Sequence, residues 1–189
     1  MKTAFMQNAV LKCIYERRSV RDFKDKPVPK KIVQELLNAA VMAPSARNSQ
    51  PWHFTIVQDR QTIDRLGEKA MQLQGLFGKF VRAGVKVAGK GTIFYNAPLL
   101  IIVSGKSDYD YLKDDVNLAV QNMFLAAHSL GLGSCWIGLA KPLNKDPETL
   151  KELGIPKGME IVAPLIFGYP KKEDKSIPKR EPKILKWIE

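Results

Sequence analysis

The chain has 189 residues, of which 45% are hydrophobic, and a formal net charge of +11. This length suits one domain with its own core, and the lack of a stretch of about 18 apolar residues and of a secretory signal predicts a soluble, cytoplasmic protein with no membrane partner. The positive residues are scattered and no helix-turn-helix, zinc-finger or aromatic single-strand pattern accompanies them, which argues against a nucleic-acid partner.

The amino-terminal part of the chain predicts two amphipathic helices. Apolar residues recur at helical spacing over residues 4–16 and again over residues 30–42. Pro27 and Pro29 break the chain between them, and Pro44 stops the second helix. The polar segment that follows Pro44 is therefore expected to be a loop.

The middle of the chain alternates between strand and helix signals. Residues 53–58 predict a strand, 59–73 a helix and 98–104 a strand that is buried on both faces. Residues 75–91 are hard to interpret, because glycine and lysine interrupt the pattern; a short helix followed by a mobile loop is the expectation.

The carboxy-terminal part begins with a long predicted helix over residues 113–130, ended by glycine. Three shorter elements should follow: a strand or turn at 134–138, a helix at 146–153 and a strand at 160–167. Strands interspersed with helices indicate an α+β domain with helices on the faces of the sheet. We find no repeat and no linker, so residues 1–189 are expected to form one domain with a basic tail at 170–189.

Three arginines and a serine lie within five positions, at Arg17, Arg18, Ser19 and Arg21. If this segment is extended, alternate side chains point to opposite sides, which places Arg18 apart from the other three. Guanidinium groups bind phosphate through charge-assisted, bidentate hydrogen bonds, so the cluster suits a small phosphorylated ligand. A solvated basic helix end remains an alternative.

Side chains for acid–base or metal chemistry are sparse. His53 and His128 are the two histidines, no serine–histidine–acid arrangement is recognisable, and Cys13 and Cys135 are too isolated for a disulfide framework or a metal site. We expect Cys135 and His128 to be structural. The chemistry would then come from a bound cofactor, and no G-x-G-x-x-G motif points to a Rossmann dinucleotide site.

Three motifs together resemble the nitroreductase family of FMN-dependent oxidoreductases. The R-R-S-x-R run is the first, and A-P-S-x-x-N-x-Q-P-W, from Ala43 to Trp52, is the second. The third runs from Gly131 to Gly138 and follows a helix that contains Asp115–Met123. The resemblance implies a central, mostly antiparallel sheet flanked by helices, and a homodimer whose subunits exchange their carboxy-terminal arms.

The resemblance also implies roles for individual residues in binding FMN non-covalently. Arg17, Ser19 and Arg21 would contact the phosphate and ribityl chain, and Arg180 would also hold the phosphate. Arg18 would reach the pyrimidine side of the ring, where it is our candidate for stabilising the reduced flavin electrostatically; no catalytic residue is assigned with certainty. The backbone N–H groups of three further residues would face the flavin N5 and O4 edge: Trp136, Ile137 and Gly138.

A second group would reach the cofactor from the other subunit, because the family's active site lies at the homodimer interface. Its members come from the loop after the second helix: Pro44, Ser45, Ala46, Asn48 and Gln50. For Asn48 and Gln50, ordinary capping of the loop is the alternative. The apolar Ile184–Ile188 segment suits an arm docked on the partner, and the 75–91 segment would lie on the substrate side.

The function implied is transfer of a hydride from NADH or NADPH to FMN, and then of electrons to an acceptor such as a nitroaromatic or a quinone, in a ping-pong cycle. A flavin-binding module without turnover is one alternative. Dehalogenation, flavin fragmentation and dehydrogenation are others that the same resemblance allows.

Overall fold

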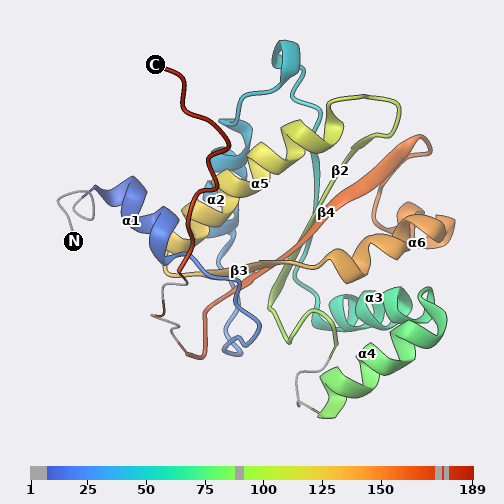
Figure 1. Ribbon diagram of the computed structural model, residues 1–189. Coiled ribbons are helices and arrows are strands. Elements are labelled where there is room, and N and C mark those ends of the chain that lie inside the picture. The colour runs from blue at the N-terminus through green and yellow to red at the C-terminus, as the bar shows by residue number, and fades with distance from the viewer. Residues whose placement is uncertain (1–7, 88–91, 173–175, 177–178) are drawn as a thin grey trace.

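The computed structural model describes residues 8–87, 92–172, 176 and 179–189 (Figure 1). Its centre is a four-stranded antiparallel sheet with the order β1-β2-β4-β3. The strands are β1 (His53–Val57), β2 (Leu99–Lys106), β3 (Gly133–Trp136) and β4 (Met159–Gly168). The predicted α+β class and antiparallel sheet are confirmed.

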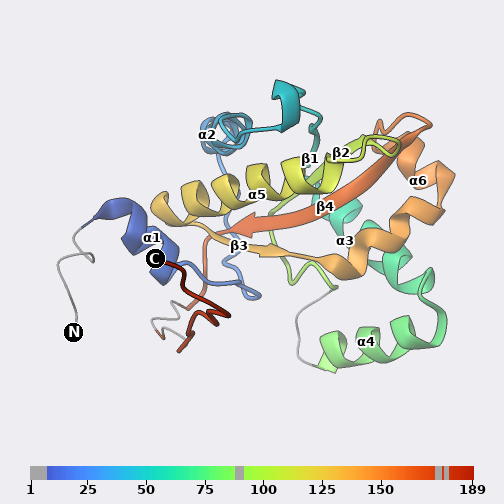
Figure 2. The ribbon, with the colours of Figure 1, turned by 45° about the horizontal axis from the view of Figure 1, so that its top comes forward.

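Helices cover both faces of this sheet, with α2 and α5 on one side and α3 and α4 on the other (Figure 2). Their bounds are α1 (Ala9–Glu16), α2 (Lys30–Val41), α3 (Arg60–Gln72), α4 (Gly75–Val87), α5 (Leu112–Ser129) and α6 (Pro147–Glu152). Two 3-10 segments, η2 (Ala46–Asn48) and η3 (Gly138–Lys145), complete the structure. Among the described residues, no helix is both long enough and apolar enough to cross a membrane.

The central strand β2 divides the core into two clusters. Leu99, Ile101 and Val103 pack with the α2 and α5 side, whereas Leu100 and Ile102 pack with the α3 and η3 side. All five side chains are fully buried because both faces of the strand are covered. This explains why the strand is a continuous apolar run rather than an alternating one.

Several element ends differ from the predictions. Helix α1 begins at Ala9 because the Asn8 side chain caps it by accepting from the N–H groups of Val10 and Leu11, and residues 4–7 of the predicted helix lie outside the described residues. The helix expected within residues 75–91 is present as α4 and has 13 residues, so it is longer than expected; residues 88–91, where the loop was expected, lie outside the described part. The segment η3 has no counterpart in the sequence prediction.

The arginine-containing segment extends the sheet beyond β3. Ser19 forms a parallel bridge with Ser134, and the Val20 N–H donates to the Ser134 carbonyl over 3.0 Å. Further along, Phe23 forms an antiparallel bridge with Pro170. The chain from Arg17 onward is therefore extended, as its interpretation as a phosphate-binding segment requires.

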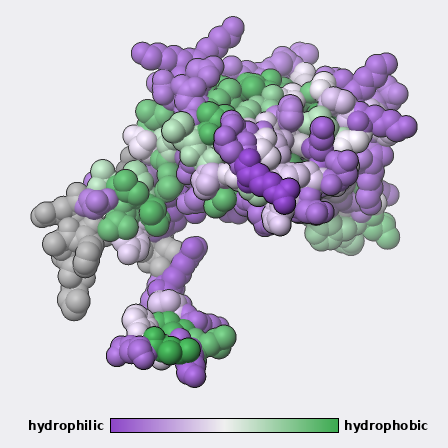
Figure 3. Space-filling view, turned by 90° about the horizontal axis from the view of Figure 1, so that it is seen from above, coloured by the Kyte–Doolittle hydropathy of each residue, from purple (hydrophilic) through white to green (hydrophobic). Residues whose placement is uncertain are grey.

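Hydrophobic side chains stand exposed at both ends of the chain. Val10 and Ile14 of α1 are 62% and 45% exposed, and Leu185 and Trp187 near the carboxy terminus are 103% and 73% exposed. Seen from above, hydrophobic residues lie on parts that project from the body of the molecule (Figure 3). Exposed apolar surface of this kind marks interaction sites.

Candidate functional site

Helix α1 delivers the arginines to the edge of the sheet. The helix ends at Glu16, and Arg17 already has an extended backbone with φ −56° and ψ 134°. The side chains of Ser19 and Arg21 are exposed, whereas Val20 between them is half-buried against the core. A Cβ on Gly133 would lie 2.6 Å from the Val20 Cβ, so a glycine is needed for β3 to approach this closely.

Arg17 is held close to other cations. Its guanidinium carbon lies 5.6 Å from the centre of the Phe124 ring on α5, and its Nε is buried without a hydrogen-bond partner among the described residues. Burial lowers the pKa of Arg17, and the nearby charges of Arg18 and Arg180 lower it further. The structure thus brings Arg17, Arg18 and Arg180 together, although Arg180 is more than 150 positions away in sequence.

Arg18 points away from the exposed side of this segment. Its Nη1 donates to the carbonyls of Tyr15 and Arg17, each over 2.7 Å, and its Nε donates to the Ser176 carbonyl over 2.7 Å. Its Nη2 is a second buried nitrogen without a partner in the described part of the chain. Arg18 therefore caps the carboxy-terminal carbonyls of α1 and ties them to the tail.

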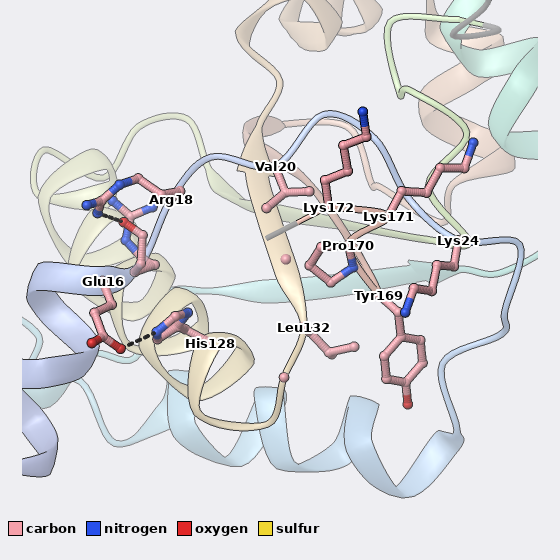
Figure 4. Close-up of a pocket in the computed structure, with 13 residues that line it drawn as sticks. Glu16, Arg18, Val20, Lys24, His128, Leu132, Tyr169, Pro170, Lys171 and Lys172 are labelled. Atoms are coloured by element: carbon pink, nitrogen blue, oxygen red, sulfur yellow. Dashed lines mark hydrogen bonds and ion pairs between the residues drawn. The ribbon is translucent and has the colours of Figure 1, made fainter. Parts of the chain in front are cut away.

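A cavity of about 720 Å³ opens beside the arginines (Figure 4). Five of its lining side chains are cationic: Arg17, Arg18, Lys24, Lys171 and Lys172. The carboxylate among the lining residues, Glu16, faces His128 at 3.9 Å between Oε2 and Nε2. Its cations would attract a small anion, but Ser19, Arg21 and Arg180 are not among its lining residues, so the cavity lies on the side of the segment that Val20 faces.

Cys135 lies on β3 next to the arginine segment. It is 1% exposed, and its burial raises the pKa of the thiol, while Arg21, Ser19 and Arg17 act in the opposite direction. Burial dominates, so the thiol stays protonated near neutral pH. Cys135 is thus a small core residue beside the arginines, as predicted.

The loop between α2 and β1 is attached to α5 by a buried carboxylate. Asp115 is 3% exposed and accepts hydrogen bonds from the Ala46 N–H over 3.0 Å and from the Tyr109 hydroxyl over 3.0 Å. In front of it, Asn48 and Gln50 are exposed and linked by a bond of 3.3 Å from Gln50 Nε2 to Asn48 Oδ1. The predicted loop residues are thus brought together: Pro44, Ser45, Ala46, Asn48 and Gln50.

The loop and the arginine cluster lie at opposite ends of α5. Asp115 is in the first turn of the helix, whereas Phe124 and His128 are near its last turn. Arg17 contacts Phe124, and the nine positions between Asp115 and Phe124 correspond to about 14 Å along the helix axis. In one chain, the loop and the arginines are therefore attached at separate points along α5.

The segment after β3 is only partly free to bind a ligand through its backbone. Trp136 is half-buried, with the Lys141 Nζ 5.7 Å from its ring centre. The Ile137 N–H donates to the Pro164 carbonyl over 2.9 Å, so it is already used within the protein. Gly138 is exposed, and a Cβ there would meet nothing within 4 Å.

Sequence reasoning missed three supporting residues, namely Tyr109, Asp115 and Phe124. The position of Asp115 could have been recognised from the sequence, because it lies three residues after Leu112 and four before Ala119, on the buried face of α5. A carboxylate at such a position must be compensated by donors. Among the described residues, no group of three or more His, Cys, Asp or Glu side chains could hold a metal ion.

Comparison with known proteins agrees with this architecture. A curated relative from Archaeoglobus fulgidus, which carries the provisional name NADH dehydrogenase/NAD(P)H nitroreductase, is 35% identical over 169 residues, or 86% of each chain. A nitroreductase with bound FMN from Bacteroides fragilis is 32% identical, with a TM-score of 0.77, and the match covers 96% of this chain and 98% of that one. A nitroreductase with bound FMN from Desulfitobacterium hafniense is 27% identical, with a TM-score of 0.82 over 96% and 99% of the two chains.

The model of the nitroreductase family matches residues 14–169, which span everything from the end of α1 to the end of β4. The matched part contains the arginine segment, the loop held by Asp115 and the strand that carries Cys135. Together with the fold and the curated relative, this match shows that the chain belongs to the nitroreductase family.

Proposed function

We propose that the protein is an FMN-dependent oxidoreductase that works as a homodimer, oxidises NADH or NADPH and reduces a nitroaromatic or quinone acceptor in a ping-pong cycle. The observation that carries this proposal is the Arg17 Nε, which is buried without a partner in the described part of the chain and lies near the charges of Arg18 and Arg180. Buried donors are almost always satisfied, so a bound phosphate is the partner that we propose for Arg17.

The residues present fit the phosphate of FMN. Arg17, Arg18 and Arg180 lie close enough to lower the pKa of Arg17, a repulsion that a bound dianion would relieve. Ser19 and Arg21 are exposed on the same extended segment and add a hydroxyl and a further guanidinium. When bound, FMN supplies the two-electron chemistry that these side chains lack.

A cation near the pyrimidine side of the flavin would stabilise the charge that reduction places there. Arg18 was our sequence-based candidate, yet it donates to three backbone carbonyls. Arg21 is exposed and two positions from Ser19, so it extends toward the same side as the other phosphate ligands. We therefore assign this electrostatic role to Arg21, with Arg18 fixing the end of α1.

At the other edge of the ring, backbone N–H groups of the segment from Trp136 to Gly138 would donate to N5 and O4. The Ile137 N–H is engaged with Pro164, which leaves Gly138 as the favoured donor. Its exposure and the open space around it would allow the ring to approach the backbone closely.

The separation of the two groups along α5 supports the homodimer. Asp115, which holds the loop, and Phe124, which contacts Arg17, are about 14 Å apart along the helix axis. In a two-fold dimer, the loop of one subunit would cover the cofactor held by the arginines of the other. The exposed apolar residues of α1 and of the carboxy-terminal segment would be buried in the same interface, with that segment docking on the partner.

Flavin content tests the cofactor. Protein purified with excess FMN should be yellow and retain one FMN per chain, and Arg17→Met should weaken FMN binding 10- to 100-fold, since charge-assisted hydrogen bonds contribute about 1.5–3 kcal/mol. Arg65→Met is the matched control, because Arg65 pairs with Glu152 on the surface. Colourless wild-type protein after incubation with FMN would refute the proposal.

Turnover is tested separately from binding. The flavin-loaded protein should oxidise NADH or NADPH when a quinone or nitroaromatic is added, with parallel lines in double-reciprocal plots. A flavin-loaded protein that fails to oxidise either nucleotide would instead support a module that binds flavin without turnover. Reduction by nucleotide without reoxidation by either acceptor would point to one of the other acceptor chemistries.

A further inference from the structure

The carboxylate of Asp115 organises the whole loop from Ser45 to Gln50. Besides the Ala46 N–H and the Tyr109 hydroxyl, its Oδ2 lies 3.3 Å from the Ser49 hydroxyl. Its Oδ1 takes the backbone donor and its Oδ2 the two hydroxyls, so both oxygens are used. The side chain is 3% exposed, which makes it the buried support of an exposed loop.

The loop needs such support because its backbone is strained. Arg47, Asn48 and Gln50 have φ values of 56°, 54° and 45°, in the left-handed region that non-glycine residues rarely occupy. Local contacts hold part of this shape, including the bond from the Gln50 N–H to the Ser45 Oγ over 3.0 Å. Strained conformations persist where surrounding structure imposes them, and they occur preferentially at ligand sites.

The carboxylate of Asp115 offers the Ser49 and Tyr109 hydroxyls an acceptor that both can reach. The Tyr109 and Ser49 hydroxyls lie 2.7 Å apart and each carries one proton. If Tyr109 donates to Ser49, the Ser49 proton can go to Oδ2 of Asp115, 3.3 Å away. If Ser49 donates to Tyr109, the Tyr109 proton can go to the same Oδ2 at 3.0 Å or to the Ala46 carbonyl at 3.3 Å. A carboxylate accepts through both oxygens, whereas a carboxamide would direct an NH₂ group either at the Ala46 N–H or at the hydroxyls.

We infer that Asp115 is a positioning residue that fixes Asn48 and Gln50 of one subunit against the flavin held by the arginines of the other. This inference rests on the proposed function. Asp115 acts through Ala46 and Ser49 and touches neither cofactor nor substrate. It keeps the loop ordered before the cofactor binds, so less conformational entropy is lost on binding.

Asp115→Asn tests the inference, with Asp114→Asn as the matched control. Asp114 is exposed and lies in the same first turn of α5, so its replacement removes the same charge without touching the loop. Hydrogen–deuterium exchange of the apo-protein should show faster uptake in a peptide covering residues 44–50 for Asp115→Asn, and unchanged uptake there for Asp114→Asn. Equal protection in Asp115→Asn and wild type would overturn the inference, whether or not the protein binds flavin.

The cofactor provides the second readout. Asp115→Asn should weaken FMN binding at least tenfold and change the visible circular dichroism of the bound flavin, while Asp114→Asn should match wild type in both. If Asp115→Asn does not fold, Tyr109→Phe and Ser49→Ala remove its hydroxyl partners singly and should each weaken binding about threefold. Wild-type affinity and spectrum in the variants that fold would overturn the inference, whereas a wild type that takes up no FMN would refute the proposed function itself.

Discussion

The guanidinium carbon of Arg17 lies 5.6 Å from the centre of the Phe124 ring. The aromatic face attracts the cation and limits the directions that its N–H groups can take. Because Phe124 belongs to α5 and Arg17 follows α1, this contact fixes the arginine cluster to the same helix that supports the loop through Asp115. Helix α5 therefore holds both the arginine cluster and the loop of one chain.

Phe124→Leu should weaken binding of FMN about two- to fivefold, since an exposed or partly exposed cation–π contact contributes about 0.5–1 kcal/mol. Leucine keeps the site apolar, so the fold should survive. Titration of the apo-protein with FMN and with riboflavin checks this, because riboflavin lacks the phosphate and its affinity should be unchanged. An equal loss for both ligands would show that the ring supports the whole site instead.

Arg21→Met should lower the two-electron reduction potential of bound FMN by roughly 20–60 mV, equivalent to about 1–3 kcal/mol, because a cation next to the reduced ring is lost. Arg18→Met should leave the potential nearly unchanged, since Arg18 donates to the carbonyls of Tyr15, Arg17 and Ser176. Dye-equilibration titration measures both. The reverse order of the two effects would restore Arg18 as the electrostatic residue.

Mixed dimers should reveal whether the loop acts on its own subunit or on its partner. A hybrid of Arg17→Ala and Asn48→Ala subunits should bind one FMN with wild-type affinity, because one of its two sites receives both intact halves. A hybrid of wild type with the double variant should bind two FMN molecules weakly. Differently tagged subunits allow each hybrid to be purified and titrated, and the opposite pattern would mean that each chain completes its own site.

Cys135 should resist alkylation in the folded protein at pH 7.5, because burial raises its pKa and its side chain is 1% exposed. Iodoacetamide labelling followed by peptide mass spectrometry should modify it at least a hundredfold more slowly than in protein unfolded with guanidinium. Raising the pH toward 9 should accelerate labelling of the folded protein only slightly, since access rather than ionisation limits it. Rapid labelling at neutral pH would identify Cys135 as a reactive thiol.

The ion pair between Lys69 of α3 and Asp146 before α6, 3.1 Å apart, should make a small pH-dependent contribution to stability. Hydrogen bonds from Thr149 and then from Lys69 lower the pKa of Asp146 below its ordinary value of 3.8. A lowered native pKa means that the contribution is present above pH 3.8 and is lost as the pH falls below that value. Lys69→Met should therefore destabilise the protein slightly at pH 6 and by a smaller amount at pH 3, as urea unfolding measures.

The matched control for this pH dependence is Lys79→Met on α4, whose side chain carries the same charge. Its free energy of unfolding should track that of wild type at both pH values. A Lys69→Met effect that grows as the pH falls would contradict the sign derived from the lowered pKa of Asp146. Because the pair is on the surface, the effect stays within the range of exposed ion pairs.

Elements with strong local signals could be predicted from the sequence alone. Strand β2 is buried on both faces and is therefore a continuous run of apolar residues. Helix α5 is buried along one face, so its apolar residues recur at helical spacing. The loop after α2 could also be predicted, since proline acts on adjacent positions. For the arginine segment, the sequence left an extended strand and a basic helix end both open, and the bridge to Ser134 identifies the strand. The order of these motifs was sufficient for the family resemblance.

The contacts between these parts depend on tertiary packing and could not be predicted. The bond from Ala46 to Asp115, the direction of Arg18 toward Ser176 and the position of Arg180 beside Arg17 join residues that are 69 to 163 positions apart. No local pattern encodes such contacts, because they depend on how the sheet stacks against α5. The separation of the loop from the arginine cluster likewise depends on how α5 packs, and no sequence motif encodes it. The proposal of a second subunit rests on this separation.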